Sequence, residues 1–279
     1  MPSRRAFLVS LTTTGLVGCV GNTPSTRTES SADTVTTEPG TPARPAVTIE
    51  AAAVQYAYRH IENVDWNAIR TADGQFVFVT VDAREADPAP NRDAFTLVTA
   101  DEIHDPVDIR ERYPVGLDVP GEPYPSEQRG GESRGWLVFE TPAQLDTAPS
   151  LRVERGTNSW EWRLDTEKAT TPPPAWEWTA STPDTVAPEE TFDITVSAEN
   201  VGDGPGTFRG AVNFSYPLYQ PKGFDIVLDP MESGEGTVSA TSKNADPGRE
   251  LNYGVRTPAG ESEVSVTVEA DSTVTQNTS

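Results

Sequence analysis

Cysteine is nearly absent from this sequence, which contains a single one, Cys19, among 279 residues. A lone cysteine cannot close a disulfide within the chain, and it cannot supply the several thiolates of a cysteine-rich zinc site. Histidine is almost as scarce, with only His60 and His104. Each histidine is more readily explained as part of a strand or loop than as the base of a serine triad. We therefore predict that the protein is not an enzyme and has no cofactor and no metal.

Lysine is also rare, and 43 acidic residues give the chain a formal net charge of −22. The acidic residues are spread over both halves of the chain, which is typical of a solvated surface and not of an acidic tail. In about 1 M salt the Debye length is roughly 3 Å, so repulsion among such carboxylates is screened. We predict a protein adapted to concentrated salt that unfolds below about 1 M salt; the alternative is an ordinary acidic secreted protein. In either case we expect no binding to nucleic acid, because no basic face follows the first residues.

No apolar run approaches the roughly 20 residues of a membrane-spanning helix. The run over residues 6–18 has 13 residues; it follows Arg4 and Arg5 and ends just before Cys19. A twin-arginine pair, a short apolar run and small residues before a cysteine are typical of an export signal with lipid attachment. We predict a signal peptide over residues 1–18, a lipid on Cys19 and a place on the outer face of the cell membrane. The alternative is a buried cysteine in an N-terminal helix.

Residues 19–45 are rich in threonine, serine and proline and hold almost no large apolar side chain. Such a segment cannot bury enough surface to fold, and as a flexible coil its reach is on the order of 30 Å. We predict a disordered linker between the lipid anchor and the folded part. Together with the acidic, lysine-poor composition, this N-terminal region resembles that of twin-arginine-exported lipoproteins of extremely halophilic archaea.

The folded part begins with a block that reads as short strands, because apolar and β-branched residues alternate with polar ones between turn signals. Residues 63–72 and 107–112 are ambiguous, and either segment could be a helical turn. The predicted strands cover residues 47–58, 75–83, 94–100, 135–140, 151–154 and 159–164.

Three segments of this block carry a resemblance to a known family. They are GQFVFVTVDARE at 74–85, DAFTLVTA at 93–100 and GESRGWLVFETP at 131–142. Their order is similar to that of the telokin-like extracellular domain family. The resemblance implies an immunoglobulin-like β-sandwich over residues 46–168, without assigned catalytic residues. The Pro/Gly-rich stretch 114–131 departs from the family pattern, in which a simple loop is more typical.

A second block follows residues 169–175, whose three consecutive prolines suit a short stiff spacer. About seven predicted strands occupy residues 176–270, and residues 271–279 are expected to be a disordered tail. The segments TFDITVSAENVGDGPGTF at 191–208 and LDPMESGEGTVSAT at 228–241 resemble the adhesion-related CARDB-type immunoglobulin-like domains. We therefore predict an all-β chain of two tandem immunoglobulin-like sandwiches. We expect the glycines of the turn at 200–204 to supply backbone with positive φ.

Candidate binding features are few. The sequons at Asn213 and Asn277 are possible glycosylation sites. Aromatic residues beside proline and glycine could form a contact patch for protein or sugar; they are Tyr113, Tyr124, Tyr216, Tyr219 and Phe224. Acidic residues around His104 could hold Ca²⁺, although a solvated loop explains them better; they are Asp101, Glu102, Asp105 and Asp108. A zinc site built on the two histidines and carboxylates is a further, weaker alternative.

These observations favour an exported cell-surface lipoprotein with a non-catalytic binding, adhesion or structural role. Its partners would be the membrane, through the lipid on Cys19, and a protein or glycan at the cell surface. Two alternatives remain open: an accessory subunit of a membrane transport or secretion complex, and an inhibitor of extracellular proteases.

Overall fold

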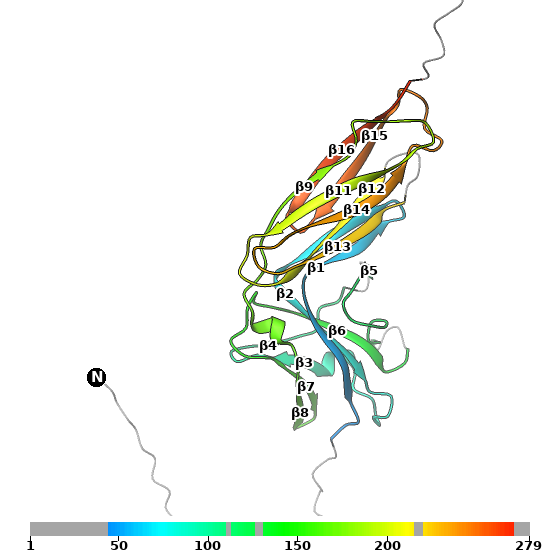
Figure 1. Ribbon diagram of the computed structural model, residues 1–279. Coiled ribbons are helices and arrows are strands. Elements are labelled where there is room, and N and C mark those ends of the chain that lie inside the picture. The colour runs from blue at the N-terminus through cyan, green and yellow to red at the C-terminus, as the bar shows by residue number, and fades with distance from the viewer. Residues whose placement is uncertain (1–43, 110–112, 126–130, 215–219, 271–279) are drawn as a thin grey trace, which may run out of the picture. The chain divides into compact units, whose positions relative to one another are not determined.

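The described part of the chain is built from β-strands, with two short 3-10 helices at Arg92–Ala94 and Glu167–Thr170 (Figure 1). The computed structural model describes residues 44–109, 113–125, 131–214 and 220–270. The strands of the first block are β1 (Thr48–Asn63), β2 (Trp66–Asp82), β3 (Phe95–Val98), β4 (Ile103–His104), β5 (Pro114–Val115), β6 (Arg134–Thr141), β7 (Ser150–Arg155) and β8 (Asn158–Arg163). They form two sheets, ordered β5-β1-β2-β6 and β4-β3-β7-β8.

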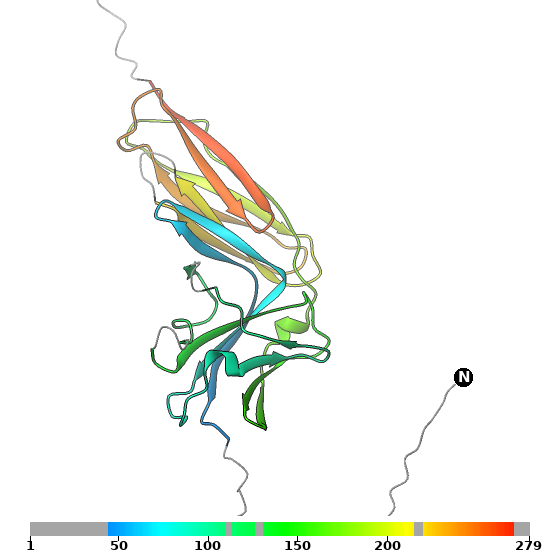
Figure 2. The ribbon, with the colours of Figure 1, turned by 180° about the vertical axis from the view of Figure 1, so that it is seen from behind.

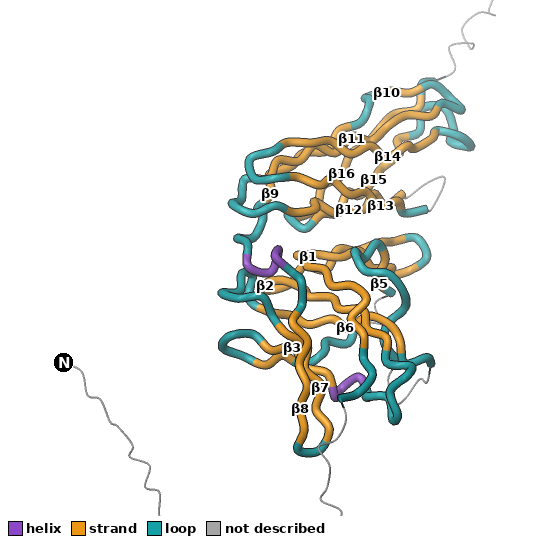
Figure 3. The backbone as a smooth tube through the Cα atoms, turned by 60° about the horizontal axis from the view of Figure 1, so that its bottom comes forward, coloured by secondary structure: helices purple, strands orange, loops and turns teal. Residues whose placement is uncertain are grey.

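The strands of the second block form two further sheets, ordered β10-β16-β15-β12-β13 and β14-β11-β9 (Figure 3). These strands are β9 (Trp176–Ser181), β10 (Thr185–Val186), β11 (Thr191–Asn200), β12 (Gly206–Phe214), β13 (Lys222–Leu228), β14 (Ser233–Thr241), β15 (Glu250–Thr257) and β16 (Gly260–Val268). All named pairings in both blocks are antiparallel except β10 with β16. The predicted all-β class with immunoglobulin-like sandwiches is confirmed.

Strand β2 is buried on both of its faces, which explains its unbroken apolar run. Val77, Val79 and Val81 belong to the core cluster between the two sheets of the first sandwich. Phe76 and Phe78 point to the opposite face, into a second cluster with Tyr58, Trp136 and Val138. Because both faces are dry, the strand reads as a continuous hydrophobic segment and not as an alternating one.

The second face of this sheet is covered by the Pro/Gly-rich stretch, which is not a simple loop. Ile109 and Val119 are buried in the cluster around Phe78. The stretch is tied to β6 by backbone bonds: Trp136 N donates to Glu122 O at 2.9 Å, and Tyr124 N donates to Trp136 O at 2.8 Å. This segment, at residues 114–125, therefore acts as a third layer of the first sandwich.

The second sandwich has one core between its two sheets. Its buried side chains come alternately from each strand, as in β11, where Phe192, Ile194 and Val196 point inward. Trp176 and Trp178 close one end of this core, with ring centroids 5.3 Å and 6.2 Å from that of Phe208. The alternation in β11 matches the pattern on which the sandwich prediction depends.

Residues 63–72 are part of a hairpin and not a helical turn. Strands β1 and β2 stay paired past the first sandwich as far as Asn63 and Trp66, with register shifts between Gln55 and Ala57 and between Ile61 and Asn63. Figure 2 shows this far half of the hairpin running alongside the second sandwich. An isolated two-stranded hairpin is marginal in water, so this segment needs the surface against which it packs. Residues 107–109 form no helix, and residues 110–112 lie outside the described part.

In the part of the chain that the structure describes, no helix is long and apolar enough to cross a bilayer.

Candidate functional site

The outward face of β12 is buried, which is unexpected for the outside of a two-sheet sandwich. Phe208, Val212 and Phe214 point into the core of the second sandwich, and the alternate residues Arg209, Ala211 and Asn213 lie on the opposite face of the strand. These outward residues are only 0–4% exposed; they are Arg209, Ala211 and Asn213. The far half of the β1–β2 hairpin covers them, since β12 contacts both β1 and β2. We call this contact, from Arg59 to Asn67 on the hairpin and from Arg209 to Asn213 on β12, the junction.

Asn213 fixes one end of the junction through its side-chain amide. Its Oδ1 accepts a hydrogen bond from the backbone N of Asn67 at 2.9 Å, and its Nδ2 donates to the backbone O of Asn67 at 3.0 Å. The amide thus pairs with the hairpin backbone much as a neighbouring strand would. Both backbone groups of Asn67 are satisfied at a position that is 8% exposed, where unpaired groups would be costly.

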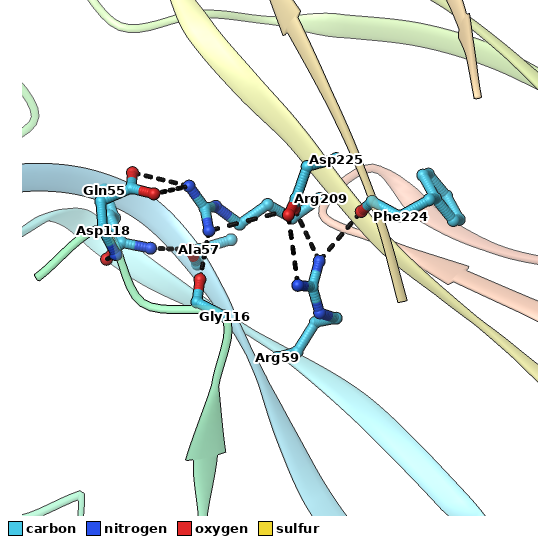
Figure 4. A network of polar contacts seen from close by, with 8 residues as sticks. All are labelled: Gln55, Ala57, Arg59, Gly116, Asp118, Arg209, Phe224 and Asp225. Atoms are coloured by element: carbon cyan, nitrogen blue, oxygen red, sulfur yellow. Dashed lines mark hydrogen bonds and ion pairs between the residues drawn. The ribbon is translucent and has the colours of Figure 1, made fainter. Parts of the chain in front are cut away.

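Arg59 fixes the other end of the junction (Figure 4). Its guanidinium donates to both carboxylate oxygens of Asp225, at 2.6 Å and 3.2 Å, and to the backbone O of Phe224 at 2.9 Å. Two glycines make room for it. A Cβ at Gly116 or Gly223 would lie 2.2 Å or 2.5 Å from an atom of the Arg59 side chain. The Arg59 side chain is 11% exposed and that of Asp225 is 40% exposed, so the arginine is shielded while its bidentate partner reaches water.

Arg209 forms a second pair that runs in the opposite direction, from the second sandwich to the first (Figure 4). Its Nη2 lies 2.6 Å from both carboxylate oxygens of Asp118, and its Nη1 donates to the backbone O of Gly116. Gln55 of β1 positions this acceptor, because its Oε1 accepts a hydrogen bond from the backbone N of Asp118 at 3.0 Å. Each sandwich therefore contributes one arginine and one aspartate to the junction.

Trp66 extends the contact to β15. The Arg256 guanidinium lies over the Trp66 ring, 4.8 Å from its centroid. A Cβ at Gly254 would be only 3.4 Å from the ring. The indole is thus placed between an arginine and a strand position without a side chain.

The Pro-rich segment provides a further connection, because it packs on the turn at 200–204. Ala175 N donates to Asn200 Oδ1 at 3.3 Å, and Val201 N donates to Ala175 O at 2.8 Å. A Cβ at Gly204 would lie 1.6 Å from the backbone O of Pro172. Gly202 and Gly204 do not have positive φ, so the predicted reason for these glycines is wrong: the close approach of the Pro172 to Ala175 backbone requires them. Gly202 N does donate to Asn200 Oδ1, as expected of an Asn turn.

The arrangement of the junction is suited to holding two sandwiches in a fixed relation. Charged, bidentate hydrogen bonds are directional, and their donors here are almost fully buried. Pro42–Ser279 accordingly form one compact unit, and the spacer predicted at residues 169–175 lies inside it. Neither a nucleophile nor an acid–base pair takes part in the junction.

A groove lies beside the junction, around Tyr113. One hollow of about 410 Å³ is lined by apolar residues that include Ile61, Val115 and Leu117. A neighbouring hollow of about 680 Å³ is lined by Glu50, Glu132 and Arg134, among others. Both hollows share four lining residues: Tyr113, Gly121, Glu122 and Pro123. We call the two hollows together the Tyr113 groove.

A third hollow, of about 590 Å³, lies where the described chain begins. The guanidinium of Arg44 stacks on the Trp162 ring, 4.3 Å from its centroid, and donates to Glu161 O at 2.7 Å. On the same wall, hydrogen bonds from Arg84 lower the pKa of the Asp82 carboxyl to about 2. These contacts fix the point at which the chain enters the first sandwich.

Most of the sites predicted from sequence lie outside the described residues or are not gathered. Arg4, Arg5, Cys19 and Asn277 fall outside the described part of the chain. Asn213 is described, and its Nδ2, the atom that a glycan would modify, is engaged with Asn67 O in the buried junction.

The predicted aromatic patch is largely absent from the described surface. Tyr124 and Phe224 are buried, at 2% and 7% exposure. Tyr124 donates to Pro90 O at 2.8 Å. Tyr216 and Tyr219 lie outside the described residues. Tyr113 is 67% exposed and is the described member of the set that stays available.

The histidines and the acidic segment do not come together as a metal site. His60 is on β1 and His104 is on β4, in different sheets. Among the described residues, no group of three or more histidine, cysteine or acidic side chains could hold a metal ion.

The segment GESRG at residues 131–135 matches the G-x-S-x-G pattern of a hydrolase nucleophile elbow. The elbow requires a strand, a sharp turn and a helix in that order. Here the segment leads into β6, and the backbone O of Ser133 accepts a hydrogen bond from Ala83 N at 2.8 Å. The segment therefore matches the sequence pattern of a nucleophile elbow but does not have its backbone structure.

No protein-family model and no curated protein matches the sequence. Among solved structures, the CARDB domain of a Pyrococcus furiosus protein, in complex with di-metal ions, is similar at 14% identity and a TM-score of 0.30. The match covers 35% of this chain and 96% of that domain. A β-glucosidase from Listeria innocua is similar at 18% identity in complex with isofagomine and 17% in complex with glucose, each with a TM-score of 0.29. Each glucosidase match covers 35% of this chain, which spans only 16% of the enzyme's length. The assignment of immunoglobulin-like sandwiches rests on the strands and sheets of the chain itself.

Proposed function

We propose that this chain is an exported lipoprotein whose two joined sandwiches present a fixed, non-catalytic binding surface outside the cell. The N-terminal part of the proposal rests on Arg4, Arg5 and Cys19, in the order that an export signal with lipid attachment requires. The acidic, lysine-poor composition supports a life in concentrated salt.

The junction is the observation that carries the binding or structural role. Two shielded arginines cross it in opposite directions, each with a bidentate carboxylate partner. A pair of domains that only needed to be tethered could rely on the Pro-rich segment. A buried, directional joint instead fixes which surfaces of the two sandwiches lie next to one another, and a composite surface of this kind suits recognition or load transmission.

The export and anchoring part is tested with the full chain expressed in a salt-adapted archaeal host. We expect the protein in the detergent phase of a phase-partition assay. Cys19→Ser should move it to the aqueous phase, because the lipid attachment atom is lost. Arg4→Lys with Arg5→Lys should leave unprocessed precursor inside the cell, and Arg27→Lys is the matched control. Unchanged partitioning of Cys19→Ser would refute the anchor.

The binding part is tested by chemical crosslinking on intact cells, followed by identification of what is attached to the chain. Capture of one surface protein or envelope component supports the proposal, and capture of a permease or secretion component would favour the accessory-subunit alternative. Turnover of a hydrolysable substrate by the purified protein, abolished by one point mutation, would overturn the non-catalytic role.

A further inference from the structure

The Tyr113 ring is an exposed aromatic side chain that the backbone holds in place. The residue is 67% exposed, and its φ of 45° is rare for a residue other than glycine. Its carbonyl accepts a hydrogen bond from Ile61 N at 3.1 Å. The next two residues, Pro114 and Val115, pair with β1. Strained backbone that the surroundings hold in place is frequent at binding sites.

Two other aromatic rings near the surface of this protein, those of Trp162 and Trp66, are covered by a cation from the same chain. Arg44 lies over Trp162 and Arg256 lies over Trp66, at 4.3 Å and 4.8 Å from the ring centroids. In the described part of the chain, no cation lies over the more exposed Tyr113. As far as the described residues go, the ring is open to the same kind of contact with a group from outside.

Among the described residues, the groove also carries a negative charge that no ion pair compensates. Of its carboxylates, Glu50 pairs with Arg134 at 3.0 Å, and Glu132 lies 3.7 Å from Arg84. Glu122 is exposed and has no ion-pair partner among the described residues. It lines both hollows together with Tyr113. An exposed ring, a carboxylate without an ion-pair partner among the described residues, and an apolar wall thus border one groove.

We propose that the Tyr113 groove binds an arginine-bearing segment of a partner protein. An arginine guanidinium can stack on a ring face while its N–H groups pair with a carboxylate, which a lysine ammonium cannot do in the same planar way. In this arrangement the guanidinium stacks on Tyr113 and pairs with Glu122, and an apolar neighbour of the arginine rests on Ile61, Val115 and Leu117. The inference rests on the proposed function, since it treats the chain as a binding protein and names the class of partner.

The test must separate this site from general attraction to a chain of net charge −22. The full chain in detergent micelles is titrated by calorimetry with a blocked glycine pentapeptide that carries one central arginine. A matched peptide carries citrulline, which keeps the planar shape and loses the charge. Both titrations are run at 0.15 M and 2 M potassium chloride, since salt screens long-range attraction more than a contact pair.

Tyr113→Asn removes the ring and keeps a residue that tolerates positive φ. We expect it to weaken binding of the arginine peptide about fivefold, and Tyr113→Phe to retain it. Glu122→Gln should weaken binding about twofold to threefold, with the larger effect at low salt. The matched controls are Ile103→Ala, at an exposed apolar residue on β4, and Glu263→Gln, at an exposed acid on β16. Both should leave binding unchanged, and circular dichroism confirms that each variant is folded.

Three outcomes overturn the inference. Unchanged binding in Tyr113→Asn would mean that only diffuse attraction is present. Binding of the citrulline peptide, or of a neutral oligosaccharide such as maltohexaose, as tight as that of the arginine peptide would mean that the groove takes a different class of ligand. If intact-cell crosslinking captures the same partner with Tyr113→Asn as with the natural chain, the groove is excluded while the proposed function stands.

Discussion

Strands β2 and β12 are both buried on two faces, but their second faces are covered in different ways. On β2 the extra face is apolar: Phe76 and Phe78 pack against side chains of the same sandwich. On β12 the extra face is polar: Arg209 and Asn213 bond to groups of the other sandwich. The contacts that bury the second face of β2 stay within one sandwich, whereas those that bury the second face of β12 join the two sandwiches.

The two kinds of contact differ in how narrowly they define the arrangement of the packed segments more than in how strongly they stabilise it. Apolar surfaces attract without direction, so several arrangements of a loop on Phe78 could bury similar area. Buried arginine and amide groups need partners in particular places, and an arrangement that misses them leaves unpaired polar groups. We hypothesise that the polar cover of β12 fixes how the sandwiches join, a role that buried ion pairs have in some proteins. Double-mutant cycles across the Arg209–Asp118 pair would reject this idea if they gave no coupling energy.

The largest loss of stability is expected for a substitution on the apolar second face of β2. Phe78→Ala should lower the free energy of unfolding by about 4 kcal/mol, because it leaves a cavity beside Phe76 and Trp136. Urea denaturation followed by circular dichroism, in 2 M salt, measures this loss. Val227→Ala, at a side chain that is 74% exposed, is the control and should change little. A loss below about 1 kcal/mol for Phe78→Ala would mean that the third layer is loosely packed.

A somewhat smaller loss of stability is expected for a substitution on the polar outward face of β12. Arg209→Ala should cost about 2 to 3 kcal/mol, because the carbonyl of Gly116 and Asp118 lose a donor that is 5% exposed, while the 43% exposure of Asp118 lets water replace part of the contact. Arg84→Ala removes an arginine from an exposed pair and should have little effect. Arg209→Met keeps most of the side-chain volume and sharpens the comparison. If this variant is as stable as the natural chain, apolar cover can replace polar cover at the junction.

Asn213→Ala is expected to cost about 2 kcal/mol, because it leaves the buried N–H and C=O of Asn67 without partners. Asn252→Ala, on the neighbouring strand β15, is the matched control at a half-buried asparagine. Hydrogen exchange should report the loss locally, as faster exchange of the Asn67 amide. Unchanged exchange at Asn67 would contradict the amide pairing.

A smaller effect distinguishes the buried tyrosines of the two sandwiches. Tyr124 O–H donates to Pro90 O at 2.8 Å, so Tyr124→Phe should cost about 1 kcal/mol. The hydroxyl of Tyr253 has no hydrogen-bond partner in the described structure. Tyr253→Phe should therefore be neutral or slightly stabilising. Thermal unfolding of both variants checks the order, and a larger loss for Tyr253→Phe would contradict it.

At neutral pH these tyrosines add no pH dependence, and their effect begins in alkali. Burial raises the pKa of both Tyr124 and Tyr253 to about 12, from 10 in the unfolded chain. Between pH 10 and 12 the unfolded chain releases these protons while the folded chain retains them, so stability falls as pH rises through this window. Urea midpoints measured from pH 9 to 11.5 should decline less steeply in the two Phe variants. Identical slopes in all three proteins would contradict the shifts.

The strands were largely predictable, and the junction was not. Alternation in β11 and the dense apolar run of β2 indicate strands directly, because side-chain direction has a period of two. In β12 the same rule places Arg209, Ala211 and Asn213 on the wet side. Nothing local contradicts that placement, since the partner backbone of Asn213 lies 146 residues earlier in the chain.

The extension of the hairpin beyond residue 63 was ambiguous for the same reason. Residues 63–72 have no strong strand pattern of their own, and their far half is stabilised by contacts to β12 and β15. The glycines at 116, 223 and 254 were the one feature of the sequence that could have indicated a close approach of another segment at the junction. A Cβ at Gly116 or Gly223 would clash with Arg59, whereas a Cβ at Gly254 would be in ordinary contact with Trp66. A glycine in the sequence does not identify the side chain that will approach it.

The sequence by itself determined the all-β class, the positions of most strands, the acidic surface and the predicted export signal, because these depend on composition and on short-range periodicity. Tertiary structure alone decided that the outer face of β12 is buried, that Arg59 and Arg209 cross between sandwiches, and that Tyr113 stays exposed while Tyr124 does not. The physical reason is that the burial of a polar side chain depends on a distant surface that supplies its partner, and no local pattern encodes that distance.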